Sequence, residues 1–227
     1  MPVTLAFDVY GTLINTQGIV SKLQEIVENK ADEFSRIWRD KQLEYSFRRG
    51  LMQNYENFSI CTSNALDFTC SYLNVSLTNE QKSELLRSYR TLPAFDDVAK
   101  ALGQLKSAGF RMYAFSNGSS DAIEELLTAA GIRDYFLGIV SVDDIRTFKP
   151  DPAVYRYFLQ KSGALGHTAW LISSNPFDVI GAVSAGMKSV WVRRSKDAVF
   201  DPWGIEPTVV VESLNELNKM CKWTESS

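Results

Sequence analysis

The sequence has few of the residues that build metal sites, disulfides or histidine-based catalysis. It contains one histidine, His167, and three cysteines, Cys61, Cys70 and Cys221, among 227 residues. A lone histidine argues against His-rich metal sites and Ser-His-Asp chemistry. Three scattered cysteines match neither a disulfide framework nor a zinc site. We therefore expect the cysteines to be packing residues, and His167 to be a solvated loop residue at the amino end of a strand.

Long apolar runs and an excess of basic charge are also missing. No segment approaches the roughly 20 apolar residues of a membrane span, and no signal-peptide pattern precedes the first apolar run. The 24 basic and 27 acidic residues leave a net charge of −3, which provides no basic face for nucleic acid or anionic lipid. We expect a cytoplasmic protein with no nucleic acid or membrane partner.

Short apolar runs alternate with helical patterns along most of the chain. Strands are predicted near residues 3–7, 111–115, 137–140, 169–172, 189–192 and 208–211, and helices near 96–108, 121–130, 153–161, 179–185 and 213–221. Repeated strand–helix units predict an α/β fold with a doubly wound, mostly parallel, Rossmann-like sheet. The tail, residues 222–227, is expected to be frayed.

Residues 14–91 lack the alternation of a strand and predict an all-helical cap inserted into a core of residues 1–13 and 92–227. Apolar spacing predicts helices near 19–27, 34–50, 58–73 and 78–90. Gly50 is a plausible helix stop, and Thr78 with Gln81 forms a capping-box pattern. Because this block directly follows the first strand, it can cover the carboxyl edge of the sheet.

The first strand ends in an acidic residue, Asp8, followed by a turn that contains Gly11. Ligands of open α/β sheets bind at the carboxyl ends of the strands. Backbone N–H groups of the turn would favour the anionic form of the carboxyl group, as a nucleophile requires. The alternative is a turn-initiating aspartate, which is common where strands stop.

Three further polar motifs follow later strands or loops. Ser116 and Asn117, with loop N–H groups, can hold an anionic oxygen, although ordinary turn chemistry is the alternative. Lys149, in Lys-Pro-Asp-Pro, is a compact cation on a rigid turn that would keep Asp8 ionised. Asp178, in Ser-Ser-Asn-Pro-Phe-Asp, is alternatively a helix N-terminal aspartate.

These motifs, in this order and spacing, resemble the haloacid dehalogenase superfamily and, more narrowly, the L-2-haloacid dehalogenases. The resemblance covers core and cap. It implies that Asp8 is the nucleophile, braced by Thr12 and Ser173, and that Ser116 and Asn117 bind the substrate carboxylate. It also implies catalytic roles for Lys149, Tyr155, Asn175 and Asp178, the last of which would orient or activate water.

The cap segment Trp-Arg-Asp-Lys-Gln-Leu-Glu-Tyr resembles the family's cap helix, in which the arginine, here Arg39, receives the departing halide. Tyr10, Leu43, Phe58 and Phe177 match apolar substrate-binding positions of the family, although Phe177 replaces an expected tryptophan. Asp40 stands where relatives often have glutamine. It could weaken anion binding or point outward.

The chain departs from the magnesium phosphatases of the superfamily at Tyr10 and Ser174, where those enzymes carry aspartates. Magnesium prefers carboxylate oxygens, so we predict no metal and no cofactor. The resemblance implies hydrolysis of short L-2-haloalkanoic acids to D-2-hydroxy acids through an aspartyl ester, and a possible homodimer. The alternatives are ring opening of azetidine-2-carboxylate, with Asp40 beside the amine leaving group, a magnesium-dependent phosphatase, and a non-catalytic binding protein.

Overall fold

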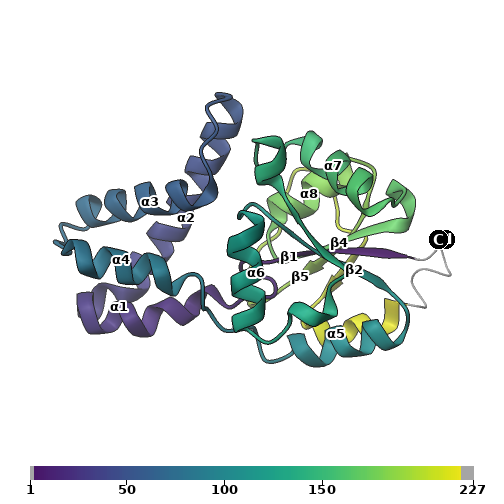
Figure 1. The fold of residues 1–227 in the computed structure, drawn as a ribbon, viewed down its shortest axis with the longest axis horizontal. Coiled ribbons are helices and arrows are strands. Elements are labelled where there is room, and N and C mark those ends of the chain that lie inside the picture. Colours follow the sequence, from purple (N-terminus) through teal and green to yellow (C-terminus); the bar gives the residue numbers. More distant parts are fainter. Residues whose placement is uncertain (1–2, 221–227) are drawn as a thin grey trace.

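The computed structural model describes residues 3–220, and in this range a parallel six-stranded sheet forms the centre of the molecule (Figure 1). The strands are β1 (Thr4–Asp8), β2 (Arg111–Ser116), β3 (Gly138–Ser141), β4 (Ala169–Ser173), β5 (Lys188–Val192) and β6 (Val209–Val211). Their order is β3-β2-β1-β4-β5-β6, and every neighbouring pair is parallel. The predicted α/β, doubly wound architecture is confirmed.

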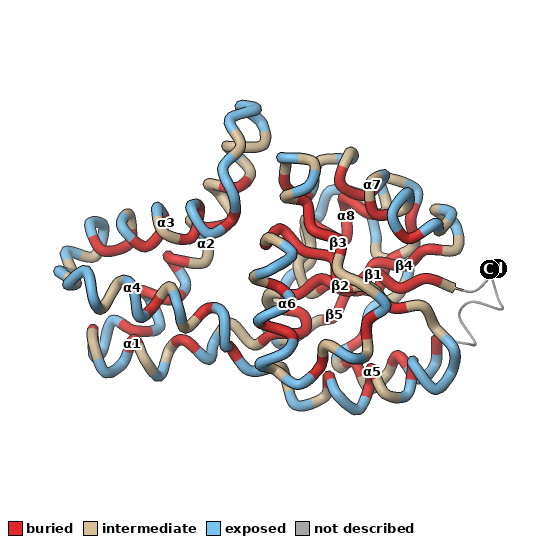
Figure 2. The backbone as a smooth tube through the Cα atoms, viewed as in Figure 1, coloured by how far each residue is buried: buried red, intermediate tan, exposed pale blue. Residues whose placement is uncertain are grey.

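Helices cover both faces of this sheet. Helices α5 (Val98–Ser107) and α6 (Ser120–Ala129) pack on one face, and α7 (Pro152–Ser162) and α8 (Pro176–Ser184) pack on the other (Figure 1). All five residues of β1 are buried, and the central strands form the buried interior of the molecule (Figure 2). A strand covered on both faces has no polar side to present, which explains why the residues before Asp8 are apolar except for the buried Thr4.

The order of the strands reverses at β1, which is a central strand of the sheet. It pairs with β2 on one side and β4 on the other, so successive connections run in opposite directions from it. Ligand sites of doubly wound folds form at such a switch point, at the carboxyl ends of the strands. Asp8, Ser116 and Ser173 are the last residues of β1, β2 and β4, and therefore meet there.

A second group of helices lies beyond this edge of the sheet (Figure 1). It comprises α1 (Val20–Val27), α2 (Ala31–Leu51), α3 (Phe58–Tyr72) and α4 (Asn79–Ser88), preceded or joined by short 3₁₀ turns at Thr16–Ile19 and Glu28–Lys30. This arrangement fits the predicted cap. The boundaries at residues 13 and 92 stay a prediction.

The two chain segments that join these helices to the sheet run side by side. Ile14 and Ala94 form an antiparallel bridge, the N–H of Asn15 donates to the carbonyl of Pro93 at 2.8 Å, and the N–H of Phe95 donates to the carbonyl of Leu13 at 3.0 Å. The helical group is therefore attached at one narrow point.

Several local predictions can be compared with the structure. The capping box of Thr78 and Gln81 is confirmed. Gly50 as a helix stop is wrong, because α2 continues to Leu51 and the left-handed residue after it is Gln53, with φ of 54°. The last predicted helix is a 3₁₀ helix, Leu214–Lys219. Cys221 and the tail 222–227 lie outside the described residues.

The remaining cysteines and the histidine occupy the predicted environments. Cys61 and Cys70 are free thiols buried in α3, and His167 is exposed in a 3₁₀ turn just before β4. Across residues 3–220, no helix combines the length and the apolar character that a membrane crossing requires.

Candidate active site

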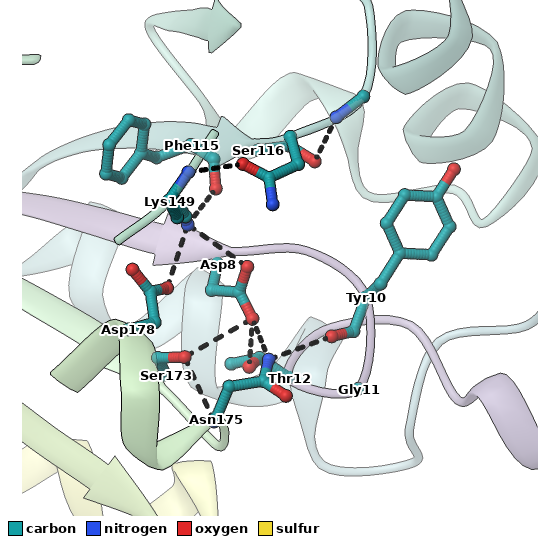
Figure 3. Close-up of polar contacts among 12 residues, drawn as sticks. Asp8, Tyr10, Gly11, Thr12, Phe115, Ser116, Lys149, Ser173, Asn175 and Asp178 are labelled. Carbon is teal, nitrogen blue, oxygen red and sulfur yellow. Dashed lines mark hydrogen bonds and ion pairs between the residues drawn. The ribbon is translucent and has the colours of Figure 1, made fainter. Parts of the chain in front are cut away.

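The carboxylate of Asp8 is held asymmetrically at the end of β1 (Figure 3). Its Oδ2 accepts three hydrogen bonds, from Thr12 Oγ1 at 2.8 Å, Ser173 Oγ at 3.3 Å and Asn175 Nδ2 at 2.7 Å. Its Oδ1 accepts one, from Lys149 Nζ at 3.1 Å. Oδ1 therefore keeps an unused lone pair, whereas Oδ2 is surrounded by donors.

The turn after Asp8 sets this geometry. Gly11 has φ of +83°, in the left-handed region that a side chain disfavours. The resulting tight turn brings Thr12 back under the strand end, where its hydroxyl reaches Asp8. Thr12 is itself fixed by Arg194, whose Nη2 donates to the backbone carbonyl of Thr12 at 2.6 Å. Nη1 of Arg194 contacts both carboxylate oxygens of Asp97, at 2.9 and 2.8 Å.

Lys149 is the cation of the site and is almost completely enclosed, with 2% of its side chain exposed. Its ammonium donates to Asp8 Oδ1, to the carbonyl of Phe115 at 2.9 Å and to Asp178 Oδ2 at 2.8 Å. An ammonium has three N–H donors, and all three are used. Burial alone would lower the pKa of Lys149, but the two carboxylates outweigh it and raise the pKa above its ordinary value.

Asp178 lies behind Lys149 at the start of α8 and has no exposed surface. Its Oδ1 accepts a hydrogen bond from the hydroxyl of Tyr155 at 2.8 Å. Burial raises the pKa of Asp178, although the charge of Lys149 opposes the shift. Burial and the neighbouring Asp178 likewise raise the pKa of Tyr155, so the hydroxyl stays protonated and donates.

Gly181 makes the Tyr155–Asp178 contact possible. It lies one turn after Asp178 in α8, and the ring of Tyr155 packs directly on its backbone. A Cβ at this position would overlap the hydroxyl and ring atoms of Tyr155. The absence of a side chain at residue 181 is therefore a steric requirement of the site.

Ser116 and Asn117, at the end of β2, present donors to the same place. Asn117 Oδ1 accepts from the backbone N–H of Lys149 at 3.0 Å, which fixes the amide so that its NH₂ group is free. Ser116 Oγ accepts from the N–H of Gly118 at 3.1 Å, which leaves its O–H free to donate. The pair therefore offers two N–H or O–H donors to an anion.

A small cavity connects these core residues with α2 and α3. Its volume for a water-sized sphere is about 20 Å³, and its lining contains every predicted substrate-binding residue: Tyr10, Arg39, Leu43, Phe58, Ser116, Asn117 and Phe177, together with Asp8, Lys149 and Asn175. A much larger cleft, about 830 Å³, shares Tyr10 and Phe58 with it. The two rings, 6.0 Å apart, therefore belong to the wall between the cavity and the cleft.

The other predicted catalytic residues lie behind this lining rather than in it. Thr12 and Ser173 contact Asp8, and Asp178 contacts Lys149, with Tyr155 behind it. The structure thus separates the residues that line the cavity from the residues that contact that lining from behind.

Asp40 does not belong to the cavity. Its side chain is 65% exposed and lies 3.6 Å from Arg36 in a surface ion pair. Adjacent residues of a helix point about 100° apart, so Arg39 facing inward turns Asp40 outward. The alternative of azetidine-2-carboxylate ring opening required Asp40 beside the amine leaving group, and the exposed position of Asp40 does not support it.

Tyr10 and Ser174 provide no metal ligand or proton-transfer group. The ring of Tyr10 packs against Phe58 and Tyr89, and burial raises the pKa of its hydroxyl. Ser174 donates its hydroxyl to the carbonyl of Gly11 at 2.8 Å. Within residues 3–220, no three His, Cys, Asp or Glu side chains are grouped to hold a metal. A magnesium phosphatase would need carboxylates at both positions.

The residues that surround Arg39 were not predicted from the sequence. Gln42 accepts from Arg39 Nη1 at 3.1 Å and is fully buried. The missed signal was its spacing of three residues from Arg39, which places both on one helix face. Phe47 was also missed. Its ring lies 5.0 Å from that of Phe177, across the cap–core boundary.

Comparison with known proteins identifies the family of the chain. A family model described as haloacid dehalogenase-like hydrolase matches residues 3–186. The chain belongs to this family. The (S)-2-haloacid dehalogenase of Pseudomonas putida is 37% identical over 214 residues, 94% of each chain, and haloacetate dehalogenase H-2 of Moraxella sp. (strain B) is 33% identical over 94% of this chain and 95% of its own.

Solved structures of this hydrolase family give the same result. The L-2-haloacid dehalogenase of Xanthobacter autotrophicus has a TM-score of 0.92 at 28% identity, covering 98% of this chain and 99% of its own. A structure of the same protein with chloropropionic acid covalently bound has a TM-score of 0.91 at the same identity and coverage.

Proposed function

We propose that this chain is an L-2-haloacid dehalogenase that hydrolyses short L-2-haloalkanoic acids to D-2-hydroxy acids through an ester on Asp8. The observation that carries the proposal is the asymmetry of the Asp8 carboxylate. One oxygen is free to attack, and the other faces three donors. The relatives named as (S)-2-haloacid dehalogenases and the covalent chloropropionic acid complex support it.

In the first step, Asp8 Oδ1 attacks the α-carbon of the substrate from the side opposite the halogen. The carbon–halogen bond breaks, the halide leaves with its electron pair, and an ester bond forms. Ser116 and the free NH₂ of Asn117 hold the substrate carboxylate, and Arg39, which lines the same cavity from α2, receives the halide. A guanidinium stabilises such a developing anion strongly in a site that excludes water.

In the second step, a water attacks the carboxyl carbon of Asp8 and gives its proton to Asp178. Oδ2 has become the ester carbonyl oxygen, so Thr12, Ser173 and Asn175 surround it as an oxyanion hole. The bond between that carbon and Oδ1 then breaks, the alkoxide takes the proton that Asp178 received from the water, and the hydroxy acid leaves with Asp8 and Asp178 regenerated. The α-carbon reacts once, so its configuration is inverted overall.

Lys149 holds Asp8 and Asp178 in place, and its three N–H donors are all used within the protein. No metal or cofactor takes part in this scheme.

We further propose a cytoplasmic homodimer. Two free thiols suit a reducing compartment, and exposed Leu51, Met52 and Tyr72 offer apolar surface for a second copy. Light scattering after size exclusion tests the dimer.

The test is halide release from separate L- and D-2-chloropropionate, with and without excess EDTA. We expect release from the L-form alone, unchanged by EDTA, and none from the Asp8→Asn variant. A single turnover in ¹⁸O-labelled water should place the label in Asp8 rather than in the product. Label in the product alone, or near-normal release by Asp8→Asn, would overturn the scheme.

A further inference from the structure

Arg39 is held by a relay of directed hydrogen bonds inside the helical cap. Arg39 Nη1 donates to Gln42 Oε1 at 3.1 Å, Gln42 Nε2 donates to Thr62 Oγ1 at 2.9 Å, and Thr62 Oγ1 donates to the carbonyl of Phe58 at 2.9 Å. The relay starts at one lining residue of the cavity, Arg39, and ends at another, Phe58. It crosses from α2 to α3.

The direction of the relay follows from the chemistry of its members. Thr62 has one hydroxyl proton and gives it to the Phe58 carbonyl, so its oxygen can only accept from Gln42. Gln42 must therefore turn its NH₂ group to Thr62 and its carbonyl to Arg39. Gln42 has no exposed surface and Thr62 only 6%, so water cannot replace either partner.

The charge of Arg39 supports the same orientation. The Gln42 NH₂ group faces Thr62, and its carbonyl oxygen faces the guanidinium. A flipped amide would set an N–H donor against the cation.

We infer that Gln42 and Thr62 are positioning residues for the leaving-group site, acting through Arg39. The inference rests on the proposed function, in which Arg39 receives the halide. The Gln42 carbonyl accepts from one guanidinium N–H and fixes the orientation of the guanidinium, which leaves the other N–H donors of Arg39 for an anion in the cavity that it lines. Without the Thr62 hydroxyl, the amide loses the bond that sets its direction.

The chain offers a matched control in Thr69. This residue is also fully buried in α3 and donates its hydroxyl to the carbonyl four residues earlier, Ala65, at 2.8 Å. Among the hydrogen bonds of residues 3–220, none joins Thr69 to Gln42 or Arg39. Thr62→Val and Thr69→Val remove the same group from the same kind of site, and differ only in the relay. Thr62→Ser keeps the hydroxyl.

The experiment measures bromide affinity of the resting enzyme, by titration calorimetry, and kcat and KM for 2-chloro- and 2-bromopropionate. For Thr62→Val we expect about tenfold weaker bromide binding and about tenfold lower kcat with 2-chloropropionate. The fall in kcat with 2-bromopropionate should be smaller, because bromide is the better leaving group. KM should be unchanged for both substrates. Thr69→Val and Thr62→Ser should resemble the wild type. Gln42→Glu, which would neutralise Arg39, should abolish bromide binding.

The outcomes separate the inference from the proposed function. A wild type that binds bromide but releases no halide from any haloacid overturns the proposed reaction, while the bromide affinities still test the relay. If Thr62→Val binds bromide as tightly as Thr69→Val, or if both lose equally, the relay has no role beyond packing and the inference falls.

Discussion

Asp8 and Asp178 are joined through the ammonium of Lys149, which lies 3.1 Å from Asp8 Oδ1 and 2.8 Å from Asp178 Oδ2. The third N–H of Lys149 donates to the carbonyl of Phe115, so all three donors of the ammonium are used within the protein. Lys149 therefore holds the two carboxylates in place and has no N–H donor left to bind a substrate.

Removal of this cation should damage both activity and stability. Lys149→Met leaves two buried carboxylates without their partner, and breaking a buried pair costs about 3–5 kcal/mol. We expect no measurable halide release and a fall in the free energy of unfolding of this size, measured by urea denaturation. Lys188→Met, at a partly exposed lysine of β5, is the control. A Lys149→Met enzyme with normal turnover would contradict the role of Lys149.

Asp178→Asn should separate the two chemical steps. Attack by Asp8 does not need a base, whereas hydrolysis of the ester does. We expect a burst of about one equivalent of halide per site, followed by a rate at least ~100-fold below that of the wild type, as for loss of a general base. Mass spectrometry should find the adduct on the peptide that carries Asp8. Steady turnover without a burst would show that Asp178 is not the base.

The acid limb of the pH profile should belong to Asp178. Its carboxylate must be ionised to accept a proton, and burial raises its pKa above 3.8. The rate should therefore fall as the pH drops through this raised pKa, at a higher pH than for an ordinary aspartate. Lys149 should give no alkaline limb below pH 10.5, since its pKa is raised above that value. If the rate of the burst in Asp178→Asn still falls at the same acidic pH, the acid limb belongs to a group other than Asp178.

Gly181→Ala should disable the site from a position outside the cavity. The new methyl group would overlap Tyr155, which must move away from Asp178 and take its hydrogen bond with it. We expect kcat to fall about tenfold, the size of one lost hydrogen bond to a charged group, with little change in KM. Tyr155→Phe in the same background should cost nothing further, because the bond is already broken. Fully additive losses would contradict this explanation.

Much of the site could be predicted because the rules that place it are local. Asp8 and Ser173 follow short buried strands, and parallel strands bring their carboxyl ends to one edge. The prediction for Gly50 was wrong because glycine is only statistically favoured at helix ends, and the packing of α2 decides where that helix stops. The Arg39–Gln42–Thr62 relay depends on two helices packing in one register, which no single segment of sequence specifies.

The paired linkers at Ile14 and Ala94 make the helical cap exchangeable. Both of its ends leave the core at neighbouring points, so the whole insertion is connected to the core in the way that a long loop would be. Insertions whose ends lie together disturb a host fold little. In the proposed function, the nucleophile, the oxyanion hole and the carboxylate site belong to the core, while the halide site belongs to the inserted helices. Leaving-group preference can therefore change by replacement of the cap, with the bond-forming machinery kept intact.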